Sequence, residues 1–135
     1  MAKYLWRLVE SDTRQTLAEN LEVADGFFSR MTGLLGRDKP QRGYGMLLVP
    51  CRSIHTFFMG FAIDVLLLSS EGQVLAVHRD VGPWRMIQGA THIHAVLEMP
   101  AGSANIVAGA RLELEAKGGH SQSPPPSVQF LSPKN

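Results

Sequence analysis

A nearly apolar stretch, SIHTFFMGFAID at residues 53–64, carries an ionisable side chain toward each end. A histidine such as His55 exchanges a proton near neutral pH, and a carboxylate such as Asp64 can orient its ring. Gly60 permits a tight turn, so we expect the two segments to pair as a hairpin that brings His55 near Asp64. The pair fits either the acid–base chemistry of a hydrolase or a structural role inside the core.

A buried carboxylate without a partner is costly, so Asp64 must be paired or protonated. We expect an arginine to pair with it and His55 to lie close by. In the hydrolase hypothesis an arginine would also stabilise the negative charge that develops during acid–base catalysis. The arginines at hand are Arg30, Arg37, Arg52 and Arg85.

A second set of polar residues lies in HIHAVLE, where His92 and His94 are followed by Glu98. The spacing H-x-H-x-x-x-E is part of the metal-binding pattern of cupins, and two imidazoles with a carboxylate suit a first-row metal. Gly89 does not stand where the cupin pattern has its glycine, and only His120 follows as a distal histidine. We therefore favour exposed histidines where a strand begins, and keep a cupin-like metal site as the alternative.

The sequence carries none of the common catalytic templates: no G-x-S-x-G, phosphate-binding loop, C-x-x-C or dinucleotide fingerprint is present. Cys51 and His55 lack the spacing of a cysteine-enzyme signature, so a small buried thiol is the better interpretation of Cys51. We assign no catalytic residue and no cofactor, and whether the protein is an enzyme stays open.

Composition narrows the class of partner. The 13 basic and 12 acidic residues leave a net charge of +1, which argues against a nucleic-acid binder. No apolar run reaches the roughly 18 residues of a membrane-spanning helix, and the start lacks the apolar run of a signal peptide. The single Cys51 is typical of a reducing compartment, so we expect a soluble cytoplasmic protein without membrane contacts. Oligomeric state is not determined by these features.

Most of the elements that must position these residues are predicted to be short strands. Residues 25–36 instead have helical spacing, with Asp25 as the expected N-cap and Gly36 as the expected stop. We predict a mainly β fold, a compact sandwich or barrel-like domain over residues 1–116, with one short helix packed against it. Residues 117–135, rich in Gly, Ser and Pro, are expected to form a flexible tail. The strand segments are residues 3–10, 20–25, 45–50, 54–59, 62–69, 72–79, 94–102 and 111–116.

Four segments in order resemble the successive motifs of an uncharacterised family, the domain of unknown function 192. They are SRMTGLLGR, the long block GYGMLLVPCRSIHTFFMGFAIDVLLLSSEGQVLAV, VGPWR and AVLEMPAG. The resemblance covers about residues 3–116 and implies a β-rich sandwich, but it implies no established activity. One departure is the segment AGARLEL, which has Ala110 and Arg111 where the family usually has a glycine–aspartate turn.

The resemblance also implies a set of recurrent polar positions, from which we form the leading hypothesis. These positions are Arg30, Arg37, His55, Thr56, Met59, Asp64, Trp84, Arg85 and Glu98. We expect them, Met59 apart, to line one cleft of a binding or accessory domain. Its arginines would hold a small anionic or polar ligand, and Trp84 would offer a stacking face. The alternatives are the hydrolase with His55 and Asp64, the cupin-like metal protein, and a purely structural role with a protein partner bound elsewhere.

Overall fold

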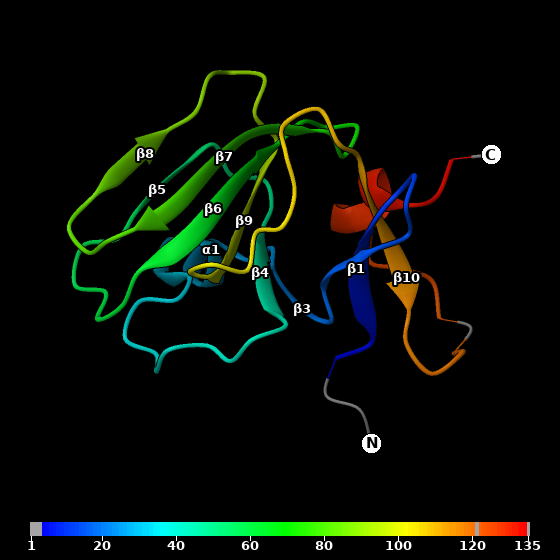
Figure 1. Ribbon diagram of the computed structural model, residues 1–135, viewed down its shortest axis with the longest axis horizontal. Coiled ribbons are helices and arrows are strands. Elements are labelled where there is room, and N and C mark those ends of the chain that lie inside the picture. Colours follow the sequence, from blue (N-terminus) through cyan, green and yellow to red (C-terminus); the bar gives the residue numbers. More distant parts are fainter. Residues whose placement is uncertain (1–3, 121, 135) are drawn as a thin grey trace.

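The structure is a computed structural model that describes residues 4–120 and 122–134, apart from the side chains of Phe27 and Phe28. Strands make up most of its regular structure (Figure 1). In chain order the elements are β1 (Trp6–Glu10), β2 (Thr16–Ala18), β3 (Asn20–Ala24), α1 (Phe27–Thr32), β4 (Tyr44–Leu48), β5 (Ser53–His55), β6 (Ile63–Leu68), β7 (Val74–Val81), β8 (Met86–Gln88), β9 (Ala95–Pro100), β10 (Leu112–Ala116) and the 3-10 helix η1 (Pro126–Leu131).

A five-stranded sheet in the order β3-β4-β9-β6-β7 forms the centre of the molecule. Only β3 and β4 are parallel to one another, and the other neighbours are antiparallel. Every residue of β6 and β9 is buried. Runs such as VLLL therefore reflect a sheet that is covered on both faces, since a sheet with one wet face would alternate apolar and polar residues.

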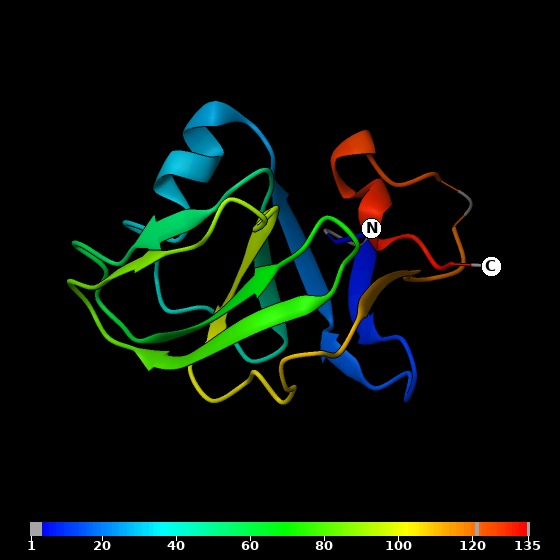
Figure 2. The same cartoon turned by 90° about the horizontal axis from the view of Figure 1, so that it is seen from above.

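One face of this sheet packs against a second sheet, ordered β10-β1-β2. Leu66 and Leu97 of the central sheet share a core cluster there with Leu8 and Leu114 of the second sheet. The opposite face packs against α1, the segment after it and the two-stranded β5–β8 ribbon. Figure 2 shows α1 and the ribbon at one end of the molecule, and η1 with β1 and β10 at the other. The prediction of a mainly β sandwich with a short helix packed on it is confirmed.

The helix is shorter than its sequence spacing predicts. α1 starts after Gly26 rather than Asp25 and ends at Gly33 rather than Gly36. The hydroxyl of Ser29 accepts the Gly26 N–H at 3.1 Å, which caps the first turn. Gly33 adopts φ +49°, a conformation that other residues take at a cost, and so the helix stops there.

The hairpin predicted between the His55 and Asp64 segments is wrong. β5 ends at His55 and pairs with β8, whereas β6 pairs with β7 and β9. Between β5 and β6 the chain turns, and Phe58 in this connection has φ +66°. β2 and β8, each three residues long, were too short to predict from alternation.

The expected tail contributes to the core. Val128 and Leu131 of η1 are fully buried in the cluster beneath the β10-β1-β2 sheet. Proline-rich composition obscured these two apolar residues, which pack three positions apart on one side of a 3-10 helix. The division at residue 116 stays a prediction. No helix within residues 4–120 and 122–134 is long and apolar enough to cross a membrane.

Candidate functional site: a pocket beneath the short helix

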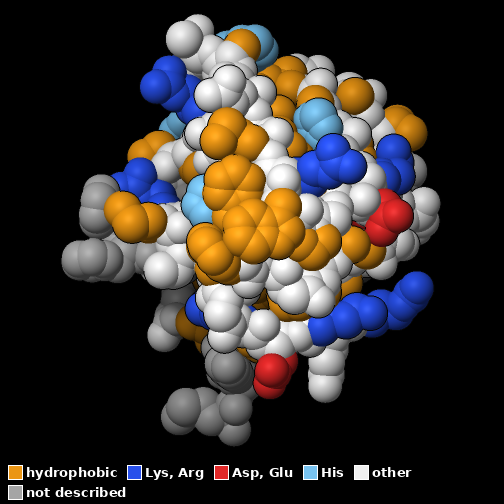
Figure 3. Space-filling view, turned by 90° about the vertical axis from the view of Figure 1, so that its left-hand side faces the viewer, with side chains coloured by type: hydrophobic (Ala, Val, Ile, Leu, Met, Phe, Trp, Pro, Cys, Tyr) orange, Lys and Arg blue, Asp and Glu red, His pale blue; other side chains and the backbone are white. Residues whose placement is uncertain are grey.

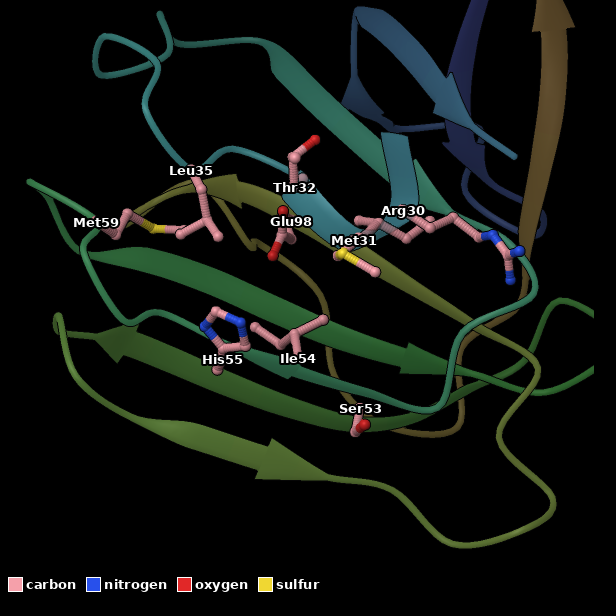
Figure 4. Close-up of a pocket in the computed structure, with 11 residues that line it drawn as sticks. Arg30, Met31, Thr32, Leu35, Ser53, Ile54, His55, Met59 and Glu98 are labelled. Carbon is pink, nitrogen blue, oxygen red and sulfur yellow. The ribbon is translucent and has the colours of Figure 1, made fainter. Parts of the chain in front are cut away.

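A pocket of roughly 180 Å³ lies between α1 and β5, with β9 and β4 behind it. Figure 4 shows Glu98 between the helix and the strand, with His55 on the opposite wall. The remaining walls are mostly apolar. The lining residues are Arg30, Met31, Thr32, Gly33, Leu35, Leu48, Ser53, Ile54, His55, Met59 and Glu98.

Glu98 is the buried ionisable group of this pocket. Its side chain is 2% exposed, and its Oε1 has no hydrogen-bond partner among the described residues. Burial raises the pKa of Glu98 to about 7, above the ordinary value of 4.5, although the Leu34 N–H and the Arg37 guanidinium oppose the rise. A buried acceptor without a donor is costly, so this oxygen is the unsatisfied polar atom of the pocket.

Gly33 leaves space for the carboxylate at its position. A Cβ on Gly33 would lie 3.0 Å from Glu98 Oε1. Gly33 was not among the predicted site residues, and its sequence signal was a glycine that follows a segment of helical spacing, where a left-handed conformation is common. The same glycine therefore ends α1 and leaves room for the buried carboxylate.

His55 lines the pocket and is half-buried. Its Nδ1 accepts the Phe57 N–H at 3.3 Å, which orients the ring, and the two rings lie 4.9 Å apart. Met59 is buried and closes the pocket near His55 (Figure 4). The predicted residues that the structure brings together here are thus Arg30, His55, Met59 and Glu98.

Arg30 borders the pocket but directs its charge elsewhere. Its guanidinium donates to the Pro50 carbonyl at 2.9 Å and to the Gly26 carbonyl at 3.3 Å. In Figure 4 the group points away from Glu98. Arg30 therefore fastens the helix to the β4–β5 connection in this structure.

Asp64 lies on the other face of the central sheet. In the register of β6 and β9, Val65 is opposite Glu98 and Asp64 is opposite Met99, and neighbours in a sheet share a face. The arginine partner expected for Asp64 is not observed. Its carboxylate instead accepts three backbone N–H groups, from Asp80, Gly102 and Ala104, at 2.8–3.0 Å.

Those three amides give Asp64 a structural role, because they satisfy a fully buried carboxylate and tie the end of β7 and the loop after β9 to β6. No hydrogen bond joins His55 to Asp64 in the part of the chain that the structure describes. The pair on which the hydrolase hypothesis depends is therefore not formed.

Thr56, Trp84 and Arg85 form a separate cluster at the end of the β5–β8 ribbon. Thr56 is fully buried; its hydroxyl donates to the Gly82 carbonyl at 2.7 Å and accepts the Arg85 N–H at 2.9 Å. Trp84 is 61% exposed and stacks on Phe57 at 5.7 Å. Thr56 thus supports the loop that presents Trp84 to solvent.

Arg37 lines a different pocket, next to the loop before β4. Its guanidinium pairs with both oxygens of Glu22, at 2.9 and 3.1 Å, and Tyr44 donates to the same carboxylate. The arginines of the predicted cleft therefore do not converge on one ligand site.

The histidines of the cupin-like pattern precede β9 rather than lying on it. His92 is exposed, and the half-buried His94 packs edge-on against Phe130 at 4.7 Å. Within the described ranges, no three His, Cys, Asp or Glu side chains are grouped so as to hold a metal.

The fold and the pocket define a class: a small mainly β domain in which a short helix and a two-stranded ribbon enclose a buried glutamate. The chain belongs to the DUF192 family, described as "Uncharacterized ACR, COG1430", whose model matches residues 8–114. The predicted resemblance is thereby confirmed.

Individual relatives agree with this assignment. A UPF0127 protein of Thermococcus sibiricus is 33% identical over 88 residues, which are 61% of this chain and 55% of that protein. The chain thus spans about half the length of that curated relative.

Two solved structures have the same fold. A candidate transcription regulator from Sinorhizobium meliloti is 22% identical with a TM-score of 0.70, and the match covers 86% of this chain and 97% of that one. A protein of unknown function from Novosphingobium aromaticivorans is 18% identical with a TM-score of 0.69, over 79% and 83% of the two chains. At these identities the likeness extends to the fold alone.

Proposed function

We propose that the protein is a binding module whose pocket beneath α1 accepts a small polar group that carries N–H donors. The observation that carries this proposal is the buried Glu98 Oε1, which has no partner among the described residues and belongs to a pocket-lining side chain. A donor from a ligand would satisfy that oxygen and gain a charge-assisted hydrogen bond.

A cationic or neutral donor suits this pocket better than an anion. The expected arginine clamp is absent from the pocket because Arg30 bonds backbone carbonyls and Arg37 pairs with Glu22. An anion would face the Glu98 carboxyl without a guanidinium in between, and like charges at close range repel. Of the small anionic or polar ligand expected from the sequence, we therefore retain a polar ligand and no longer propose an anionic one. A cytoplasmic location stays a prediction from the single cysteine.

A titration with n-butylamine tests the proposal, since it offers an ammonium on an apolar stem. At about pH 8 Glu98 is mostly ionised, and Arg30, Arg37, Cys51 and His55 are the charged or titratable groups around it. We expect amide resonances of pocket residues to shift in nuclear magnetic resonance spectra, and n-butyrate to cause no such shifts.

The matched variants are Glu98→Gln and Glu71→Gln. The second changes an exposed carboxylate that is distant from Glu98 in the sequence. The Glu98→Gln change should weaken n-butylamine binding at least about tenfold, because it removes the charged acceptor. The Glu71→Gln change should have no effect. Binding that is equal in both variants would show that the pocket is not the site.

A further inference from the structure

The pocket is too small to enclose a complete ligand. Its volume of roughly 180 Å³ is below the range of about 300–1,000 Å³ that is usual for small-molecule sites. A group the size of one long side chain fits, and the rest of the ligand must lie on the neighbouring surface. The features of that surface therefore indicate what the ligand is.

Beside the pocket lies an unpaired strand edge. β5 forms a two-stranded sheet with β8 and pairs with no other strand among those that the structure describes. The Thr56 N–H donates to the Arg85 carbonyl, so Thr56 and Arg85 form a hydrogen-bonded pair next to β5. In an antiparallel ladder, hydrogen-bonded pairs alternate with non-hydrogen-bonded pairs along the strand. Ser53 and His55 consequently direct their backbone N–H and C=O groups away from β8. The Cys51 thiol indeed reaches the Ser53 carbonyl, at 3.2 Å.

Both edge residues line the pocket. The backbone N–H groups of Ser53 and His55, the His55 carbonyl and the carboxylate of Glu98 are thus available to one ligand at the same time, whereas the Ser53 carbonyl already accepts the Cys51 thiol. Unpaired edges bind extended peptides by adding them as a further strand, and an adjacent pocket then receives one side chain. A small molecule would use the pocket, but it would have no need of the regularly spaced backbone groups of an edge.

An exposed aromatic patch adjoins the same ribbon. Phe58 and Trp84 are 77% and 61% exposed, and both adopt left-handed backbone conformations, with φ +66° and +64°. Bulky residues rarely take this conformation, because it strains the backbone. Ring contacts run from His55 at the pocket through Phe57 to Trp84 and Phe58, at centroid distances of 4.9, 5.7 and 4.6 Å.

Figure 3 shows apolar side chains gathered on the face that forms the left-hand end of Figure 1, where β5 and β8 lie. Such a patch is typical of a surface that a partner covers. Aromatic side chains also supply much of the binding energy where proteins meet. A ligand that continues from the pocket along the ribbon would cover these rings.

We propose that the ligand is an extended segment of another protein, which adds to the free edge of β5 and inserts a lysine side chain into the pocket toward Glu98. Charge complementarity identifies the inserted residue, because the buried group at the pocket is a carboxylate. Apolar residues that flank the lysine would lie on Phe58 and Trp84. This inference rests on the proposed function and names its ligand class.

Blocked peptides distinguish this ligand from a free amine. The probe is acetyl-Val-Thr-Lys-Thr-Val-amide, and n-butylamine represents the lysine side chain alone. One control peptide has norleucine in place of lysine, and another keeps the lysine but carries N-methyl groups that block strand pairing. Isothermal titration calorimetry on the full chain at about pH 8 measures each affinity.

We expect the lysine peptide to bind at least about tenfold more tightly than n-butylamine, because strand addition contributes backbone hydrogen bonds. The norleucine and the N-methylated peptides should each lose about tenfold or more. Amide shifts at Ser53 and His55 should accompany binding of the lysine peptide alone.

Two variants test the aromatic patch. Glycine tolerates the left-handed conformation, so Trp84→Gly and Phe58→Gly should leave the fold intact. Each should weaken the peptide about threefold or more and leave n-butylamine unchanged, since the amine does not reach the patch. Val107→Ala, at a 69% exposed position away from the pocket, should affect neither ligand.

The outcomes separate the two proposals. Binding of n-butylamine with no gain from the peptide, or with no loss on N-methylation, would overturn the peptide inference and leave the pocket's proposed function in place. Failure of both ligands to bind would overturn the two proposals together.

Discussion

Glu98 and Asp64 show how two buried carboxylates on neighbouring strands differ in role. Asp64 accepts three backbone N–H groups and is fully satisfied, whereas Glu98 retains an oxygen without a partner among the described residues. Because β6 and β9 are in register with Val65 opposite Glu98, the two carboxylates face opposite sides of one sheet. Asp64 therefore holds neighbouring backbone segments in place, and Glu98 is the carboxylate on which the proposed binding function rests.

The raised pKa of Glu98 predicts that this residue destabilises the fold at alkaline pH. Its folded pKa of about 7 exceeds the ordinary 4.5, so the folded state holds the proton more tightly than the unfolded state. The contribution of Glu98 to the free energy of unfolding should then be highest below about pH 4.5, fall as the pH rises through 7, and level off above it. The full loss is about 3 kcal/mol.

The Glu98→Gln change should remove this loss. At about pH 8 the variant should be more stable than the unchanged protein by up to about 3 kcal/mol, and at about pH 4 the two should be nearly equal. Urea unfolding at both pH values measures the difference, and other carboxylates cancel because both proteins carry them. A difference that is the same at both pH values would contradict the raised pKa.

At the scale of the elements, α1 and the β5–β8 ribbon enclose the pocket, and the positive φ of Gly33 sets where α1 stops. The helix could be predicted from its apolar spacing, but its end was expected at Gly36. It ends at Gly33 instead, where the chain passes close to Glu98 and a Cβ would be crowded. The residue at which α1 ends is therefore determined by contacts between segments that are distant in the sequence.

A pair of alanine substitutions tests this role of Gly33. Gly36 has φ +72° and open space around it, so Gly36→Ala should cost about 1 kcal/mol from backbone strain alone. Gly33→Ala, at φ +49° and ψ −123°, is strained as well and also crowds Glu98 Oε1 at 3.0 Å, so it should cost at least roughly 1 kcal/mol more and weaken n-butylamine binding. Urea unfolding and the amine titration measure both effects. Equal costs would mean that Glu98 moves aside freely.

At the scale of the whole molecule, the central sheet separates two cores, and the C-terminal segment closes one of them. η1 buries Leu131 against residues that include Leu112 and Leu68. Leu131 Cδ2 would lie 3.1 Å from a Cβ on Gly72, so the segment packs closely on the turn before β7. The structure thus extends the core beyond the segment that the sequence predicted to be folded.

Leu131→Ala should lower the free energy of unfolding by about 2–4 kcal/mol, since it leaves a cavity in a well-packed core. Val107→Ala, at an exposed position, should change it by less than about 0.5 kcal/mol. Denaturant unfolding measures both variants. A loss at Leu131 no larger than at Val107 would show that residues 126–131 are a dispensable tail.

The sequence by itself determined the β-rich class, because apolar runs and alternation follow from local geometry. It also determined the family, through motifs whose order and spacing are specific. His55 and Glu98 were both among the predicted site residues and both line the pocket, although His55 was expected to pair with Asp64. The register of β6 and β9 places Asp64 on the opposite face of the sheet from Glu98. A shift of one residue along a strand moves a side chain to the other face.

Only the tertiary structure decided which polar residues meet. Arg30, Arg37 and Arg85 were expected in one cleft, but the guanidinium of Arg30 bonds backbone carbonyls and that of Arg37 pairs with Glu22, and Arg85 is held through its backbone N–H on Thr56. The pairing of β5 with β8 joins segments more than 30 residues apart, and no local pattern encodes it. The pocket depends on that pairing, because long-range contacts alone place the β5 edge beside Glu98.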